Sequence, residues 1–159
     1  MIRIAKLTDY AIVLLTYIAR DGKRGVHAAR DLAAGSHLPV PTVSKILKCL
    51  SRGGLLVSHR GVAGGYSLAK APDAINLAEI IAVMEGPVAL TECSTSCPGL
   101  CEIEPVCPVR NNWRKINDVV VRSLENLTLL DMTEPLPKPS AAPTRKDGGR
   151  PHLVLFAKR

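Results

Sequence analysis

The chain has 159 residues, of which 47% are apolar and only five are aromatic, namely one Trp, one Phe and three Tyr. This composition excludes a disordered chain as a whole, and no stretch approaches the roughly 20 apolar residues of a membrane span. The net charge of +7 is uneven, because residues 1–70 carry +8, residues 71–137 carry −6 and residues 138–159 carry +5. A concentrated basic module indicates a polyanionic partner, with solubility as the less specific explanation.

Three amphipathic helices are predicted in the basic module. The first has Thr8 as a candidate N-cap and runs to about residue 20. The second covers residues 28–34, and the third runs from Pro41, which suits a first helical turn, to the glycines at 53 and 54. Their predicted buried faces are Ala11, Leu14, Leu15 and Ile18 in the first, Ala29, Leu32 and Ala33 in the second, and Val43, Ile46, Leu47 and Leu50 in the third.

The opposite face of the third helix has the composition of a DNA-recognition surface. Small hydroxyls and cations on a helix that follows a short helix and a glycine-bearing turn suit the major groove. For one helix considered alone, a solvated face would be the simpler explanation. The candidate DNA-contacting residues are Thr42, Ser44, Lys45 and Lys48.

A β-hairpin is predicted directly after the third helix. Residues 55–59 and 66–68 have strand composition, and a glycine-rich turn separates them. Arg60 at the tip of this wing can enter a minor groove or contact phosphates, whereas Tyr66 is expected to pack the hairpin down. Three helices and a wing in a cationic segment predict a winged helix-turn-helix. No nucleotide-binding phosphate-loop string occurs.

Four of the five cysteines lie between residues 93 and 107, after a helix predicted to begin at an Asn76 N-cap and to end at Gly86. The prolines and glycine of this loop exclude a regular helix or strand, so convergent thiolates at a soft metal centre are expected to order it. Its C-x3-C-x3-C-x5-C spacing favours an iron-sulfur cluster over a zinc site or a thiol-disulfide switch. The fifth cysteine, Cys49, is expected at the edge of the helical core.

The longest periodic segment runs from about Val109 to Leu127, and a short turn capped by Thr128 and Asp131 follows it. A winged domain does not need so long an apolar stripe for its own core, so pairing with the same helix of a second chain is expected. Residues 134–159 are rich in Pro, Gly and charge and are expected to form a disordered basic tail. The stripe comprises Trp113, Ile116, Val120, Leu124 and Leu127, with Val119 beside it.

These segments together resemble the winged-helix iron-sulfur regulators of the Rrf-two (Rrf2) type, which include regulators of cluster assembly and nitric-oxide sensors. The match runs from the opening LTDYAI through the wing string RGVAGGYSLAK and the cysteine loop to Trp113 and the final NLTL. The resemblance implies a mainly α fold with a small β-hairpin. A winged helix-turn-helix domain is expected over residues 1–70, and a cluster-binding loop with a dimerisation helix over residues 71–133.

The resemblance also implies a ligand set. Some family members use a histidine three residues after the last cysteine, where this chain has Arg110, which stays protonated and cannot ligate. Other members take an acidic or imidazole ligand near the N-terminus of the partner subunit, and Asp9 lies where such a residue would be. The resemblance thus leaves the fourth ligand open between Cys97, which is an addition to the family pattern, and Asp9. A 2Fe-2S cluster is the first expectation, and a 4Fe-4S cluster stays open. The three thiolate ligands implied by the family are Cys93, Cys101 and Cys107.

The expected function is that of a cytoplasmic, homodimeric transcriptional regulator. It is expected to bind a palindromic site on double-stranded DNA, and the resemblance implies that it controls genes for iron-sulfur cluster assembly. The alternatives are a nitric-oxide or redox-sensing repressor of the same fold and a DNA-binding protein with a zinc or thiol switch. No paired carboxylates and no Ser/His/Asp arrangement suggest an enzyme with a small-molecule substrate.

Overall fold

The computed structural model describes residues 3–21, 25–95 and 99–134, so the tail predicted to be disordered lies almost wholly outside the described residues. The fold is mainly helical with one two-stranded hairpin, as predicted. No helix of the described part of the chain is long and apolar enough to cross a membrane. The α-helices are α1 (Lys6–Arg20), α2 (Ala29–Ser36), α3 (Val40–Arg52), α4 (Leu77–Glu85), α5 (Arg110–Glu125) and α6 (Leu129–Thr133). The strands are β1 (Leu56–His59) and β2 (Gly65–Leu68), and the 3-10 helices are η1 (Pro72–Ala74), η2 (Glu92–Ser94) and η3 (Glu104–Val106).

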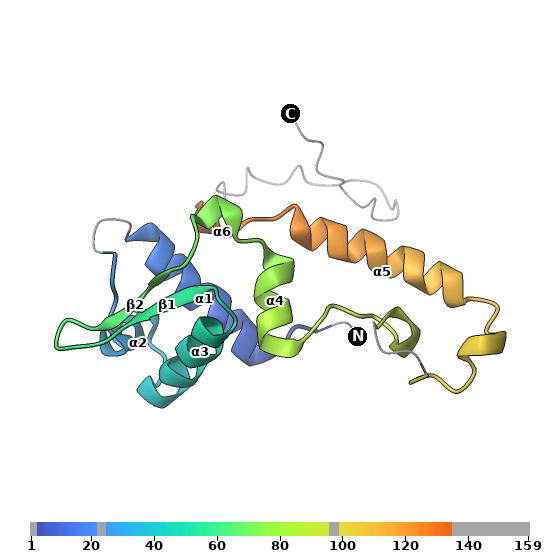
Figure 1. The fold of residues 1–159 in the computed structure, drawn as a ribbon. Helices are drawn as coiled ribbons and strands as arrows, with labels where there is room; N and C mark the ends of the chain where they lie inside the picture. Colours follow the sequence, from blue (N-terminus) through green and yellow to red (C-terminus); the bar gives the residue numbers. More distant parts are fainter. Residues whose placement is uncertain (1–2, 22–24, 96–98, 135–159) are drawn as a thin grey trace, which may run out of the picture.

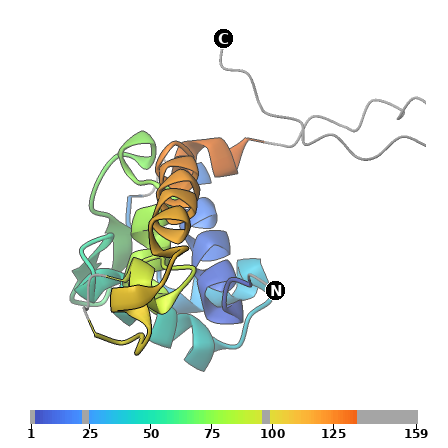
Figure 2. The ribbon, with the colours of Figure 1, turned by 90° about the vertical axis from the view of Figure 1, so that its right-hand side faces the viewer.

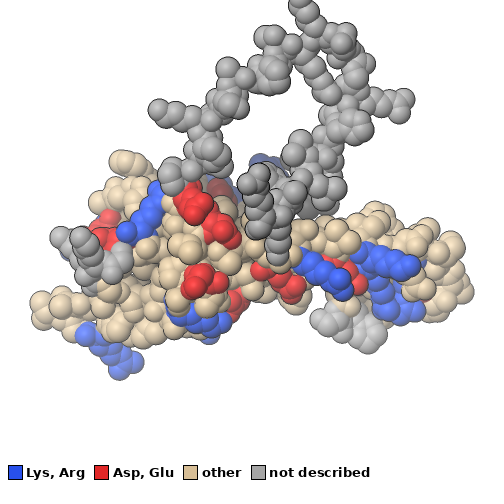
Figure 3. Space-filling view, turned by 90° about the horizontal axis from the view of Figure 1, so that it is seen from above, with Lys and Arg blue, Asp and Glu red and all other residues tan. Residues whose placement is uncertain are grey.

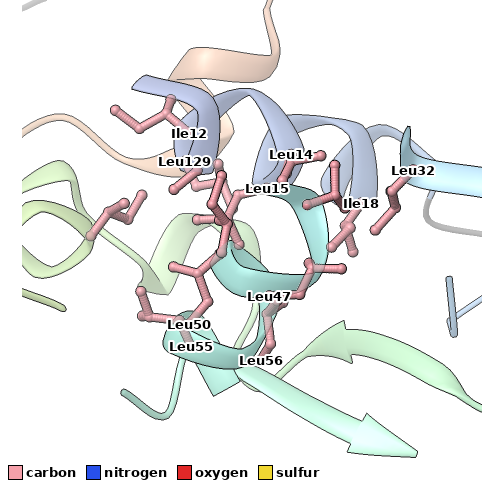
Figure 4. Close-up of a cluster of buried hydrophobic side chains, with 14 of the residues drawn as sticks. Ile12, Leu14, Leu15, Ile18, Leu32, Leu47, Leu50, Leu55, Leu56 and Leu129 are labelled. Carbon is pink, nitrogen blue, oxygen red and sulfur yellow. The ribbon is translucent and has the colours of Figure 1, made fainter. Parts of the chain in front are cut away.

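The hydrophobic core lies where α1, α2 and α3 meet the start of the hairpin (Figure 4). Every apolar residue predicted for the buried faces of the first and third helices is buried. Each of the Leu, Ile and Val side chains among them contributes about 1.5–3 kcal/mol when it is removed from water. The core also includes Ile75, Ile80 and Leu129, which lie beyond the first 70 residues. The winged domain is therefore completed by later parts of the chain.

The N-terminus of α1 differs from the prediction that Thr8 is its N-cap. The N-cap is Ala5, and Thr8 is fully buried inside the first turn. Glu85 Oε1 accepts hydrogen bonds from the Ala5 N–H at 2.9 Å and from the Thr8 hydroxyl at 2.5 Å. The prediction was wrong because a carboxylate distant in sequence supplies the acceptor, and a negative charge suits a helix N-terminus.

The second helix continues past its predicted end to Ser36. Gly35 is part of the helix and lies against the Tyr17 ring. A Cβ at Gly35 would lie only 3.3 Å from Tyr17 Cε1, so the missing side chain leaves room for the ring. The Tyr17 hydroxyl donates to Gly35 O at 2.6 Å. His37, with φ of 55°, ends the helix in a left-handed conformation and leads through Pro39 into α3. The helices α2 and α3 and the turn between them form a helix-turn-helix, as predicted.

The predicted hairpin is antiparallel, with His59 opposite Gly65. The segment before α2 pairs with its second strand, because His27 and Tyr66 exchange two backbone hydrogen bonds of 2.8 and 2.9 Å. Gly65 permits this approach, since a Cβ there would lie 2.4 Å from His27 O. Tyr66 packs against the core, as predicted.

The chain returns to the winged domain after α5. The Leu77 N–H donates to Leu127 O at 2.9 Å, and the Leu129 N–H donates to Ile75 O at 2.8 Å. These bonds hold the start of α4 beside the start of α6. In Figure 1, α6 accordingly lies close to the winged domain, whereas the other end of α5 extends away from it.

Both helix caps predicted for this junction are confirmed. Asn76 Oδ1 accepts a hydrogen bond from the Glu79 N–H at 2.8 Å at the start of α4. At the start of α6, Thr128 and Asp131 form a reciprocal capping box. Such caps satisfy backbone N–H groups that the helix itself cannot pair.

Candidate DNA interface and metal centre

The exposed side of α3 carries the residues predicted to contact DNA. Lys45 and Lys48 are exposed, whereas Thr42 and Ser44 are half-buried. Neither lysine forms an ion pair within the described residues. Their charges are therefore available to an external anion, and the hydroxyls beside them can donate to or accept from base edges.

The wing lies at the same end of the molecule as α3 (Figure 1). Arg60 opens the turn between β1 and β2, is exposed, and has no ion-pair partner in the described part of the chain. Gly61, with φ of 110°, and Gly64, where a Cβ would lie 2.5 Å from His59 O, keep this turn compact. The compact turn leaves the Arg60 side chain exposed at the tip of the wing.

The surface charge is divided along the length of the molecule. Figure 3 shows Lys and Arg side chains near the end that carries the wing and again towards the far half of α5, with Asp and Glu side chains mainly between them. The basic end that carries the wing suits the phosphate backbone of DNA. The second basic region lies near the cysteine loop.

The cysteine loop connects α4 to α5 at the end of the molecule opposite the wing (Figure 1), and Figure 2 views the molecule from that end. Cys93 is buried in η2, and its sulfur lies 3.3 Å from the Thr91 hydroxyl oxygen. Cys101 and Cys107 are half-buried, and all three are free thiols. Cys97 lies outside the described residues.

A buried carboxylate joins the loop to the first two turns of α5. Glu104 Oε1 lies 2.9 Å from Arg110 Nη2 and 3.2 Å from Arg114 Nη2. Arg114 Nε also donates to Cys93 O at 3.1 Å. The two ends of the loop are therefore linked through Arg114 and Glu104. Sequence spacing did not predict this network, because it depends on how the loop folds back onto the helix.

The predicted ligands do not converge in the described structure. Within the described residues, no group of three or more His, Cys, Asp or Glu side chains is arranged to hold a metal ion. Asp9 lies on the exposed side of α1, beside Arg3 and Lys6 rather than beside the cysteines.

The donor chemistry of the loop nevertheless fits an iron-sulfur cluster. Three free thiols share one short loop, and thiolates are the usual ligands of such clusters. Arg110 Nε, at the end of the same loop, is buried and has no hydrogen-bond partner among the described residues. Ligand convergence and metal binding commonly occur together, because the metal supplies the free energy that orders the site.

Much of the apolar stripe of α5 is exposed within the part of the chain that the structure describes. Trp113 is 40% exposed, Ile116 is 46% exposed and Val119 is 64% exposed. Further along the helix, Val120 and Leu124 line one side of a groove of about 370 Å³ between α5, the N-terminal segment and the end of α4. An exposed stripe of this extent marks a surface that contacts another molecule.

Asn117 is a structural residue that the sequence pattern did not reveal. It is buried, with Oδ1 accepting from the Leu90 N–H at 2.9 Å and Nδ2 donating to Val88 O at 3.3 Å. The middle of α5 thereby fixes the segment that leads into the cysteine loop. A single amide among apolar residues carries no local signal of this role.

Comparison with known proteins gives consistent similarities. The Rrf2 family model, described as "Iron-dependent Transcriptional regulator", matches residues 4–135. The HTH-type transcriptional regulator NsrR of Halalkalibacterium halodurans is 28% identical over 130 residues, which cover 82% of this chain and 89% of that protein.

Two solved structures share the fold. The structure of CymR (YrzC), the global cysteine regulator of B. subtilis, has a TM-score of 0.66 and 28% identity, covering 84% of this chain and 97% of that one. The structure of T. potens IscR has a TM-score of 0.62 and 24% identity, covering 82% and 85% respectively. The latter likeness supports the fold alone.

Proposed function

Because the chain belongs to the Rrf2 family of iron-dependent transcriptional regulators, we propose that its cysteine loop holds an iron-sulfur cluster that controls DNA binding. The chain is a helix-turn-helix transcriptional regulator, and its relatives are regulators and not enzymes. The proposed targets are genes for iron-sulfur cluster assembly. The observation that carries the proposal is a loop with three free thiols, joined at one end to the winged domain and at the other to an exposed apolar helix.

The proposed ligands are the three cysteines of the described loop with one further residue. Cys93, Cys101 and Cys107 supply thiolates, and the fourth position belongs to Cys97 or to Asp9 of the partner subunit. A ligand set rich in thiolate favours a 2Fe-2S cluster, with 4Fe-4S second. When bound, the cluster supplies a centre whose redox state and integrity respond to the chemical environment.

The chain's own residues provide a route from the loop to the DNA-binding surface. Asn117 and Arg114 fix the start of the loop to α5, and Arg114 also holds Glu104 near its end. Glu85 links the end of α4 to the start of α1. Pairing of two α5 helices would place two winged domains on one palindromic site. The cluster alters DNA binding only if it favours one arrangement of these domains over another.

Two alternatives retain DNA binding. A nitric-oxide or redox-sensing repressor is supported by the similarity to NsrR. A zinc site or thiol switch would use the same cysteines without iron.

The test is the metal content of protein purified without air. We expect a coloured protein that contains iron and acid-labile sulfide, and a shift in operator affinity when the cluster is removed. Cys93→Ala, Cys101→Ala and Cys107→Ala should each lose the cluster, while Cys49→Ala, which alters a cysteine on α3, should retain it. A colourless protein that holds zinc would refute the proposal.

The fourth ligand is assigned by comparing two further variants. If Cys97 is the ligand, Cys97→Ala should lose the cluster and Asp9→Ala should keep it. The reverse result assigns Asp9 of the partner subunit. Normal clusters in both variants would show that the proposed ligand set is incomplete.

A further inference from the structure

Arg110 has a donor that the protein does not satisfy. Its Nε is the only buried side-chain nitrogen or oxygen without a hydrogen-bond partner among the described residues. The Arg110 side chain as a whole is 38% exposed, but the Nε atom itself is buried. Buried donors are almost always paired, so this exception calls for an explanation, such as an acceptor that is present only when a ligand is bound.

The neighbouring arginine provides a direct comparison. Arg114 shares Glu104 with Arg110, but Arg114 Nε donates to Cys93 O at 3.1 Å. Arg110 uses Nη2 for Glu104 at 2.9 Å and leaves Nε free. The two guanidiniums therefore have different roles, since one is committed to backbone and carboxylate acceptors and the other retains a donor.

The position of Arg110 limits what that acceptor can be. Arg110 is the first residue of α5, and its backbone N–H points to Cys107 O at 3.5 Å. The first turn of α5 contains no acidic residue, and Arg110 and Arg114 share the single carboxylate of Glu104, although Glu92 and Glu102 also lie in the loop. A cluster ligated by thiolates is anionic and carries sulfur acceptors, so it matches both the charge and the free donor.

We infer that Arg110 Nε donates a hydrogen bond to a sulfur atom of the bound cluster, either a sulfide or a cysteine thiolate. This inference rests on the proposed function. A hydrogen bond to sulfur stabilises the additional negative charge of the reduced cluster and so raises its reduction potential. Arg110 therefore helps to set the potential at which the regulator responds.

The first test uses the wild-type protein and needs no substitution. Protein labelled with ¹⁵N at arginine Nε is reduced without air and studied by pulsed electron paramagnetic resonance. We expect a weak coupling between one arginine nitrogen and the reduced cluster. The coupling should disappear in Arg110→Lys and persist in Arg114→Lys, which keeps the same charge at the neighbouring position.

The second test measures the reduction potential of the same proteins. We expect Arg110→Lys to bind iron and sulfide in the wild-type ratio and to show a lower midpoint potential, whereas a solely structural arginine would leave the potential unchanged. A wild-type cluster without arginine coupling overturns the inference and leaves the proposed function intact. A wild-type protein without any iron-sulfur cluster overturns both.

Discussion

Glu85 shows how one side chain joins distant parts of the chain. Its Oε1 accepts hydrogen bonds from the start of α1, while its backbone forms the last residue of α4. Thr8, which donates one of these bonds, is fully buried and precedes the candidate ligand Asp9. A displacement of the end of α4 would therefore also move the start of α1, because the hydrogen bonds to Glu85 connect the two helices.

Arg60 is predicted to contact a DNA phosphate through the wing. Loss of one phosphate contact reduces the magnitude of the slope of log affinity against log salt by about 0.9, so Arg60→Ala in both subunits should reduce it by about 2. The affinity for cognate and random duplexes should fall together. Binding titrations at several salt concentrations measure both quantities.

The matched control for Arg60 is Arg122→Ala, which removes an exposed arginine from α5. It should leave the salt slope at the wild-type value. Equal slopes for wild type and Arg60→Ala would show that the wing does not touch phosphate. Substitution of Ser44 or Lys45 should instead change the preference between cognate and random sequences.

At the scale of the elements, hydrophobic periodicity predicted what depends on local spacing. The faces of α1 and α3 were predictable because residues three and four apart share one side of a helix. The Asn76 and Thr128 caps were predictable because each acceptor lies within three residues of its donor. These rules require no knowledge of the tertiary fold.

The remaining features depend on contacts between distant segments. The role of Glu85 at α1, the Glu104 network and the buried Asn117 all join residues that no periodic pattern relates. The cysteine spacing favoured a metal centre, but the described structure does not bring the thiols together as ligands. Ligand geometry belongs to the metal as much as to the chain, so sequence alone does not define it.

The α5 helix is predicted to mediate dimerisation through its exposed stripe. Ile116→Glu should raise the dimer dissociation constant on the order of 100-fold or more, because an unpaired charge buried in an interface costs several kcal/mol. Sedimentation velocity over a range of protein concentrations measures this change. DNA affinity should fall in parallel at low protein concentration.

Asn111→Glu introduces the same charge on the opposite side of α5 and serves as the control. Asn111 is exposed and lies outside the stripe. The Asn111→Glu protein should have the same dimer dissociation constant as the wild type. An Ile116→Glu protein that remains as strongly dimeric as this control would exclude the stripe as the interface.

The cap of α6 makes stability depend on pH. The Thr128 backbone N–H and hydroxyl both donate to Asp131, and they hold the pKa of its carboxyl below its ordinary value. Because the folded pKa is lower than the unfolded one, the ionised carboxylate stabilises the fold above the ordinary value of 3.8. That contribution is lost as the pH falls through the folded pKa.

Asp131→Asn tests this dependence in urea unfolding between neutral and acidic pH. The difference in unfolding free energy between wild type and variant should be largest at neutral pH and should shrink on acidification. Glu134→Gln is the control, because the structure shows no hydrogen bond to that side chain among the described residues. A difference that does not change with pH would contradict the assignment.

At the scale of the whole molecule, Leu129 closes the winged domain from the far end of the described chain. It is fully buried in the core formed by α1 and α3. Leu129→Ala should destabilise the protein by about 2–5 kcal/mol, through lost burial and the cavity that remains. Leu130→Ala, one residue later, alters a side chain that is 47% exposed.

Chemical denaturation of both variants measures the contrast. Leu130→Ala should lie within about 0.5 kcal/mol of wild type in the monomeric protein. Similar losses for the two variants would indicate that α6 does not complete the core. The comparison is best made in the Ile116→Glu background, where dimerisation does not contribute.

Backbone hydrogen bonds join residues 75–77 to residues 127–129. The segment between them therefore begins and ends at neighbouring positions in the fold. After residues 75–77 the chain first forms α4, whose Ile80 belongs to the core, and only the cysteine loop and α5 then extend away before the chain returns to the same place. Insertions whose ends lie close together can be exchanged with little strain on the host domain. The cysteine loop and α5 can therefore vary in length and sequence while the helix-turn-helix part of the chain keeps its structure.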